Sequence, residues 1–529
     1  MPVSLHRPVQ KVNFTTTTPS PVGGLNARDT LITMPQEDAS LLRNMIVDAY
    51  GTGVRRGSQK HAINLGGEVQ TLLVWMGGTS SKMWAMVTDN VTAWMTEVTT
   101  SGDYTGVAKA ITGLSHAQWQ QTNFANSGGQ HLVAFNGADD GIWYSSSGGL
   151  TRLLLGDGIV SGTIKNIDPK VIVAVVTHQR RLWFAQKDTM VAWYLPTDQI
   201  YGIASKFDFG PLFKLGGRLV GLFTWSKNTY KGPQDQLVVV TSEGEAAVYE
   251  GTDPASASSW ALVGIQTIGS PVGTNFGGNI SGDLFLLTEQ KLISMNLASA
   301  SDTAGINSSQ QVAAKIHKVF DKEITENKDE YGWQIFDYPA YNLLIVNTPT
   351  HQLVANKVTR AWSECYGFSA LCWQLFRQDA FFGTATGEVY QGFWAYKDKI
   401  ELDGTGGDPI PYEAQQAFTL MDAPGLNKYV SMVRPSLLSE EAPQTLVGVL
   451  FDYNISTVFG ALTTEDIESA FWDEDVWDVG TWGSGLLVSQ EWTTVGGIGY
   501  AVTIRLKGIA TAETYWIATD WIYNVGPGL

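Results

Sequence analysis

The chain has 529 residues, enough for two or three domains with a sizeable buried core. Apolar residues make up 44% of it and charged residues 16%, which excludes an intrinsically disordered chain. The net charge of −17 excludes broad attraction to nucleic acid, because such binding requires Lys and Arg to neutralise phosphates. Solubility alone is the simplest reason for an acidic chain.

The chain contains two cysteines, Cys365 and Cys372, both in aromatic-rich sequence. This number excludes a disulfide framework, and the spacing is not that of a CxxC metal site, so we expect buried free thiols. The first residues lack the apolar run of a signal peptide, and the most apolar short run, 171–176, is too short to span a bilayer. We therefore expect a protein made in the cytoplasm without a membrane span.

Residues 1–66 are predicted to form an N-terminal extended arm and a short helix. Four prolines fall within 1–34 and discourage helix, so this part either docks on a neighbouring domain or subunit or frays. After Pro35, approximate helical spacing predicts the short helix from Ala39, Leu41, Leu42, Met45 and Ile46. The Gly-rich stretch 51–57 lacks the Lys-Ser/Thr pair of a phosphate loop, and is interpreted as a turn into the first strand.

Residues 67–397 contain a repeated pattern of two β-type segments around a short polar turn. Seven such hairpins recur at intervals of roughly 40–60 residues, often with an aromatic in the second strand. They are 82–95, 131–144, 181–194, 236–249, 282–295, 341–356 and 380–392. This period predicts an all-β fold, a β-propeller of about seven blades, give or take one. A series of β-sandwiches is the alternative, but it requires modules of roughly 100 residues.

The hairpin 380–392 is expected to belong to the blade that closes the ring. A strand shared with the segment near Val69 is one way to close it, and Tyr390 is expected to pack between blades. The stretch 308–324 interrupts the β pattern and places five apolar residues on one helical face. It predicts an inserted helix, with Ser308 or Ser309 as N-cap, that either packs on the propeller rim or contacts another subunit.

Residues 398–529 follow a linker rich in Gly and Pro and are predicted to form a small C-terminal β domain. This domain is expected to rejoin the N-terminal arm. Its predicted strands are 430–438, 445–453, 486–491, 500–506 and 514–523. The acidic stretch 465–478 does not have the spacing of a calcium loop, so a solvated loop is the expectation there.

No catalytic constellation is found in the sequence. The seven histidines are scattered, without an HxH or HExxH motif, and there is no GxSxG elbow. A glycosidase needs two carboxylates that face one pocket, whereas Asp139 and Asp140 are adjacent and point apart. The closest match to a sialidase box, 145–152, lacks its Asp and Trp. We therefore predict a protein that is not an enzyme, with no catalytic, cofactor-binding or metal-binding residues and no cofactor.

Several segments resemble tail proteins of short-tailed bacteriophages. The resembling residues begin with the run 23–26 (Gly-Gly-Leu-Asn) and continue with Asp29, Met34-Pro35, Asp38-Ala39, Asn44 and the run 53–57 (Gly-Val-Arg-Arg-Gly). Further resembling segments are 236–251, 338–343, 492–500 and 519–521. Together they extend over the whole length, although none is diagnostic alone.

This resemblance implies a tail nozzle, or tail tube, protein in the virion. It implies a ring, expected to be a hexamer, below the tail adaptor protein, which forms the distal DNA channel and carries or abuts fibres or spikes. Phage DNA would pass through the lumen without sequence-specific binding, and the acidic charge would let it slide. The N-terminal arm and C-terminal domain are the expected contacts with the ring and the adaptor. The alternatives are a receptor- or glycan-binding propeller and a polysaccharide hydrolase.

Overall fold

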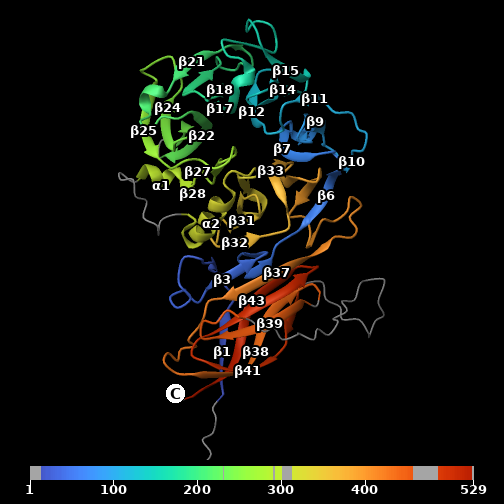
Figure 1. Cartoon of the computed structure of the whole chain (residues 1–529), viewed down its shortest axis with the longest axis vertical. Helices are drawn as coiled ribbons and strands as arrows, with labels where there is room; N and C mark the ends of the chain where they lie inside the picture. The colour runs from blue at the N-terminus through green and yellow to red at the C-terminus, as the bar shows by residue number, and fades with distance from the viewer. Residues whose placement is uncertain are drawn as a thin grey trace, which may run out of the picture.

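The computed structural model describes residues 13–229, 232–289, 292–300, 312–441, 443–456 and 486–526. Figure 1 shows two bodies, a β-propeller and a narrower β body joined end to end. The first and last described strands, β1 (Phe14–Pro19) and β43 (Thr514–Val525), both lie in the narrower body. No described helix is long and apolar enough to cross a membrane.

Four consecutive sheets form the first part of the propeller. Each contains an antiparallel meander of four strands, and the second is extended by two parallel strands. The outer strands β11 and β21 follow longer connections that themselves contain a short strand of another sheet. The first comprises β7 (Glu68–Trp75), β8 (Lys82–Thr88), β9 (Ala93–Glu97) and β11 (Ile111–Leu114). The second comprises β12 (Gln120–Asn126), β13 (Gly129–Phe135), β14 (Gly141–Ser145), β15 (Gly149–Leu155), β16 (Thr163–Lys165) and β20 (Gly202–Ile203). The third comprises β17 (Ile172–His178), β18 (Arg181–Gln186), β19 (Val191–Tyr194) and β21 (Ser205–Asp208). The fourth comprises β22 (Leu219–Thr229), β23 (Gly232–Thr241), β24 (Glu245–Gly251) and β25 (Trp260–Thr267).

The closing sheet combines strands from far apart in the sequence. Its propeller strands are β33 (Ala370–Phe376), β34 (Asp379–Thr384) and β35 (Val389–Gly392). They are joined by β6 (Ser58–Ile63), which pairs antiparallel with β35, and by β10 (Gly102–Asp103). A strand shared with the N-terminal part therefore closes the ring, ahead of Val69. Val69 packs on this sheet instead: a Cβ on Gly383 would lie 2.4 Å from Val69 Cγ1, so only glycine fits there.

Two smaller units lie between the fourth and closing sheets. One is a three-stranded sheet of β26 (Gly277–Ile280), β27 (Asp283–Leu287) and β28 (Leu292–Ser294). The other contains β29 (Gln334–Tyr338), β30 (Leu343–Asn347), β31 (Gln352–Asn356) and β32 (Trp362–Cys365), and it continues into the narrower body.

All seven predicted hairpins pair antiparallel, but they do not make seven blades. In the described residues, the propeller has about five blades, because only five of its sheets have four or more strands and are not shared with the narrower body. The hairpin 282–295 lies in a sheet without a fourth strand, and the hairpin 341–356 lies in the sheet that the two bodies share. Counting hairpins therefore overestimated the number of blades.

The narrower body, called the half-barrel below, consists of two facing sheets. One contains β3 (Asp38–Arg43), β37 (Asp408–Gln416), β42 (Val502–Ala510) and β39 (Gln444–Phe451), with β2 (Gly24–Leu25) and β36 (Lys397–Asp398) at its margins. The other contains β1, β4 (Met45–Val47), β5 (Thr52–Val54), β43, β38 (Lys428–Ser439), β40 (Leu487–Gln490) and β41 (Thr493–Gly499). Trp516 and Trp521 fill the space between the sheets and are almost fully buried.

N-terminal strands are integral to the half-barrel. β1 pairs with β43 along its whole length, from Phe14 opposite Tyr523 to Pro19 opposite Ala518. Trp521 donates a hydrogen bond from its indole nitrogen to Thr18 Oγ1 at 3.0 Å. The described part of the predicted arm is thus a strand of the chain's own sheet, while residues 1–12 lie outside the described residues.

The predicted helix after Pro35 is wrong. The same residues form β3 and β4, separated by Asn44, whose φ of 54° is in the left-handed region. Ala39 and Leu42 are buried by pairing of β3 with β37, a contact 375 residues away in sequence that local spacing does not reveal.

The inserted helix occurs, but it begins later than predicted. α2 spans His317–Asn327 after a 3₁₀ turn at Ala314–Ile316, while the predicted caps at 308 and 309 lie outside the described residues. Of the five residues on the predicted apolar face, Ile316, Phe320 and Ile324 are each less than 5% exposed, whereas Val312 and Val319 are partly buried. A second helix, α1 (Met295–Ala300), follows β28.

Candidate functional site

The junction between the two bodies is held by Arg55, whose side chain is fully buried. Its guanidinium makes a two-pronged ion pair with Asp398, with distances of 2.8 Å to Oδ1 and 2.6 Å to Oδ2. It also donates to the backbone oxygens of Arg56 and Tyr366 and lies 4.2 Å from the ring centroid of Phe368. Arg55 therefore ties together the N-terminal segment, the closing sheet and the start of the C-terminal part.

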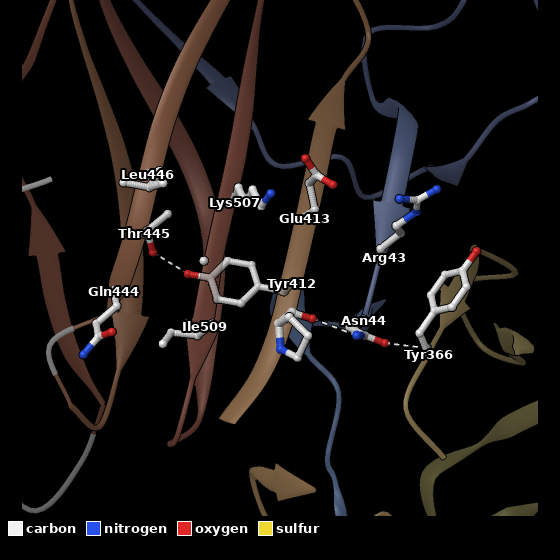
Figure 2. A pocket seen from close by; sticks show the side chains of 12 residues that line it. Arg43, Asn44, Tyr366, Tyr412, Glu413, Gln444, Thr445, Leu446, Lys507 and Ile509 are labelled. Carbon is white, nitrogen blue, oxygen red and sulfur yellow. Dashed lines mark hydrogen bonds between the residues drawn. The ribbon is translucent and has the colours of Figure 1, made fainter. Parts of the chain in front are cut away.

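Asn44 extends this network into the half-barrel, as Figure 2 shows. Its amide nitrogen donates to the Pro411 carbonyl at 2.7 Å. Its Oδ1 accepts from the Tyr366 backbone nitrogen at 2.7 Å and from Arg55 Nε at 3.0 Å. One left-handed asparagine at the end of β3 thus bonds to both bodies, which explains why the chain turns sharply there.

The run 23–26 folds against Asp38, which is 1% exposed. Asp38 accepts hydrogen bonds from Asn26 at 2.7 Å and from Lys315, just before α2, at 2.7 Å. A Cβ on Gly23 would lie 2.0 Å from Asp38 Oδ1, so this close approach requires glycine. The middle of the run, Gly24–Leu25, pairs in parallel with β3. The cluster therefore fixes the N-terminal segment to the helix insertion.

A cavity of about 720 Å³ opens beside the junction, on the half-barrel sheet of β3, β37, β42 and β39. Figure 2 shows Tyr412 at its centre, hydrogen-bonded to Thr445, with Leu446 and Ile509 on one side. Burial raises the pKa of Tyr412 to about 12, so its hydroxyl stays protonated at neutral pH. The lining residues are Arg43, Asn44, Tyr366, Pro411, Tyr412, Glu413, Gln444, Thr445, Leu446, Lys507, Gly508 and Ile509.

Two charged side chains of this cavity are already paired. Arg43 lies 3.6 Å from Glu364, and Glu413 accepts from Arg505 at 2.7 Å. Leu446 and Ile509, which are 38% and 42% exposed, contribute apolar surface to the rest of the cavity lining. This arrangement suits non-covalent packing more than proton transfer, because the ionic groups are engaged and the tyrosine is held neutral.

A buried histidine lies behind the cavity wall. His351 stacks on Tyr366 at 4.6 Å between ring centroids and shares a hydrogen bond with Thr350 Oγ1 at 2.8 Å. Its ring lies 3.7 Å from Glu323 of α2 and 3.9 Å from Glu364 of β32. Burial lowers the pKa of His351 and raises the pKa of Glu364, so both groups are driven toward their neutral forms. We interpret the group as part of the packing between α2 and the shared sheet.

The central opening of the propeller is narrow and polar. Gln120 of β12 donates to Asn275 Oδ1 at 2.6 Å and to the Thr274 carbonyl at 3.0 Å. These residues belong to the second sheet and to the approach to β26, which are not neighbours in chain order. What remains is a pocket of about 420 Å³, lined largely by Gln, Asn and Thr. As far as the described residues show, a pocket of this size leaves no room for duplex DNA in the centre of the propeller.

The structure brings some of the resembling residues together and leaves others apart. Gly23, Asn26, Asp29 and Asp38 meet in one cluster, and Asn44 meets Arg55 in the adjoining one. The segment 236–251 lies away from both, in β23 and β24 of the fourth sheet. Asp520 pairs with Arg434 within the half-barrel at 2.7 Å.

The structure also bears on the two cysteines and on possible metal sites. Cys365 and Cys372 are buried and free, as expected, and burial raises the pKa of each thiol to about 12. No group of three or more His, Cys, Asp or Glu within the described residues is arranged to hold a metal ion. The acidic stretch 465–478 lies outside the described residues.

Sequence reasoning missed the cavity and the Arg55–Asp398 pair. The glycines of the run 53–57 suggest a phosphate loop, which the sequence does not support. The two arginines between those glycines were the one local sign of a special role for Arg55. Nothing in the sequence links Arg55 to an aspartate 343 positions away. The cavity residues come from five separate segments, so no local pattern marks them.

No family model and no curated protein matches the chain. Among solved structures, the chain is similar to BBS1N, crystallised in complex with ARL6DN, at 10% identity and a TM-score of 0.39, over 64% of this chain and 98% of that one. It is also similar to the Cps50 (Swd1) β-propeller domain of Myceliophteria thermophila, at 11% identity and a TM-score of 0.37, with the same coverage.

Proposed function

We propose that the chain is a structural subunit of a short phage tail, the nozzle, which assembles as a ring around the path of the DNA. The observation that carries this proposal is the junction. Two of the residues that resemble tail proteins, Asn44 and Arg55, join the propeller to the half-barrel there, and others meet in the cluster around Asp38. A subunit whose two bodies share a sheet and a buried ion pair suits a mechanical part of a particle.

The closed centre of the propeller limits where DNA could run. Because Gln120 and Asn275 meet inside the opening, the channel of a nozzle would lie between subunits, on the axis of the ring. The net charge of −17 supports a lumen that repels phosphates and lets the genome slide. The tail adaptor and the fibres or spikes are the proposed protein partners, and the virion the proposed location.

The location is tested by labelling. Antibody raised against the purified chain should bind the end of the tail farthest from the capsid when purified particles of the phage that encodes the chain are viewed by electron microscopy. Label on the capsid, or absence of the chain from purified particles, contradicts the proposal.

A glycan-binding role is the second candidate, and one observation favours it. Tyr341 and Trp394 are 40% and 49% exposed, and the guanidinium of Arg56 lies 5.2 Å from the Tyr341 ring and 5.0 Å from the Tyr396 ring. Exposed aromatic faces beside a cation are the kind of surface on which sugars stack. Binding of the isolated chain to a glycan array, lost in Trp394→Ala, would favour this role over the nozzle.

A further inference from the structure

The central pocket of the propeller, of about 420 Å³, is built by strands from distant parts of the chain. Its lining comes from β7 and β12, from Asn275 and the start of β26, and from β29 and β33. Figure 1 shows β7, β12 and β33 around the centre of the propeller. The volume of the pocket is within the range of about 300–1,000 Å³ that is usual for small-molecule sites.

Amide side chains fix the walls of this pocket by bonding to the backbone of a neighbouring strand. Gln121 of β12 accepts from the Val74 backbone nitrogen at 2.9 Å and donates to the Leu72 carbonyl at 3.4 Å. On the other side, Gln334 of β29 accepts from the Trp373 backbone nitrogen at 2.8 Å and donates to the Trp373 carbonyl at 2.9 Å. The walls are therefore formed before any ligand arrives, which lowers the cost of binding.

Other amide groups of the pocket have no hydrogen-bonding partner within the described part of the chain. The half-buried side chain of Gln374 on β33 makes no hydrogen bond there. Gln120 bonds to Asn275 through its amide nitrogen, which leaves Gln120 Oε1 and Asn275 Nδ2 unused. None of these atoms is closed off from solvent. The pocket thus presents both donors and acceptors to a ligand.

The described lining of the central pocket contains no charged side chain. The half-barrel cavity differs in this respect, since it includes Arg43, Glu413 and Lys507. A phosphate, carboxylate or ammonium group would enter the central pocket without a counter-charge, and burying an uncompensated charge is costly. We therefore expect an uncharged ligand, although the chain itself carries a net charge of −17.

The apolar residues of the pocket favour a hydroxyl-rich ring over a planar base. Trp119 and Trp373 are 3% and 1% exposed, so neither offers a free face on which a nucleobase could stack. Met76, which is 51% exposed, offers apolar contact to C–H groups instead. An amide side chain can donate to one hydroxyl and accept from the next, which matches the adjacent hydroxyls of a sugar.

We propose that the central pocket binds an uncharged mono- or disaccharide, with Gln374, Gln120 and Asn275 as its hydrogen-bonding residues. The site is separate from the exposed aromatic surface of Tyr341 and Trp394, because neither of these residues lines the pocket. It also goes beyond the proposed nozzle, since sugar binding here requires only one copy of the chain. Its failure would leave the nozzle proposal standing.

Saturation-transfer NMR on the full chain tests the site. The probes are glucose, galactose, N-acetylglucosamine, maltose and lactose, with glucose phosphate and glucuronate as charged counterparts. Gln374→Leu removes the free amide, whereas Met76→Trp narrows the pocket at an exposed position and leaves the polar groups in place. Gln130→Leu removes an exposed amide that does not line the pocket, and it is the matched control.

At least one uncharged sugar should bind the wild-type chain. Its affinity should fall at least tenfold in each pocket variant and stay unchanged in the control. Equal melting temperatures show that a loss of binding is not a loss of folding, and if one pocket variant does not fold, the other decides.

Three results would overturn the proposal. The first is that no uncharged sugar of the panel binds at millimolar concentrations. The second is that the charged counterparts bind as tightly as the uncharged sugars. The third is sugar binding that persists in both pocket variants and is lost in Trp394→Ala, which would place the site on the exposed aromatic surface.

Discussion

Replacing Arg55 with methionine should destabilise the junction strongly. The change removes the ion pair with Asp398, which is 6% exposed, and leaves that carboxylate buried without its cation. Removing one partner of a buried pair costs about 3–5 kcal/mol, because the remaining charge has lost its compensation. Hydrogen bonds from Arg55 to Asn44 and to two backbone oxygens are lost as well.

Urea denaturation followed by tryptophan fluorescence measures the effect. Arg180→Met is the matched control, because Arg180 pairs with Asp198 while its side chain is 73% exposed, and an exposed pair contributes about 0–1 kcal/mol. The double variant Arg55→Met/Asp398→Asn should cost less than the sum of its single changes, by about 0.5–3 kcal/mol. If Arg55→Met is no more destabilising than Arg180→Met, the junction does not depend on this pair.

Three further predictions concern single sites. Tyr390→Ala should lower the free energy of unfolding by about 3–5 kcal/mol in the same assay, because Tyr390 is 4% exposed and stacks on Phe382. Tyr390→Phe loses only the hydrogen bond to Glu388 and should cost about 1 kcal/mol. Gly23→Ala should cost about 1–3 kcal/mol from overpacking against the Asp38 carboxylate, and a melting temperature equal to that of the wild type would refute the close contact. Burial lowers the pKa of His178 to about 4, so below about pH 6.5 the unfolded chain takes up a proton that the folded chain excludes. Stability should therefore fall between about pH 6.5 and 4, by up to about 1.4 kcal/mol per pH unit from this group, and His178→Gln should show a shallower fall.

The fold class could be predicted because its signal is local. Each hairpin needs only a polar turn between two β-type segments, and all seven pair as expected. The number of blades could not be predicted in the same way. Whether a hairpin becomes a separate blade depends on what pairs with its outer strand. In the sheet of β29–β32, the outer strand β32 pairs with β3, so the sheet extends into the half-barrel.

The N-terminal part shows why local spacing can mislead. Ala39, Leu42 and Met45 have spacings that fit one face of a helix, yet they lie in two strands on either side of Asn44. Their burial comes from β37 and from β32, more than 300 residues away in sequence. Asp398, the partner of Arg55, is also more than 300 positions away in sequence. The sequence therefore singled out the run 53–57 without indicating its contacts.

The central claim is that the chain is a ring-forming part of a phage tail, and a cryo-electron reconstruction of the particle that contains it tests this most directly. The account predicts several copies, expected to be six, around the tail axis below the adaptor. DNA should lie between the copies and outside each propeller. A single copy at the periphery of the particle, or a ring whose axis is not the DNA path, would contradict the account.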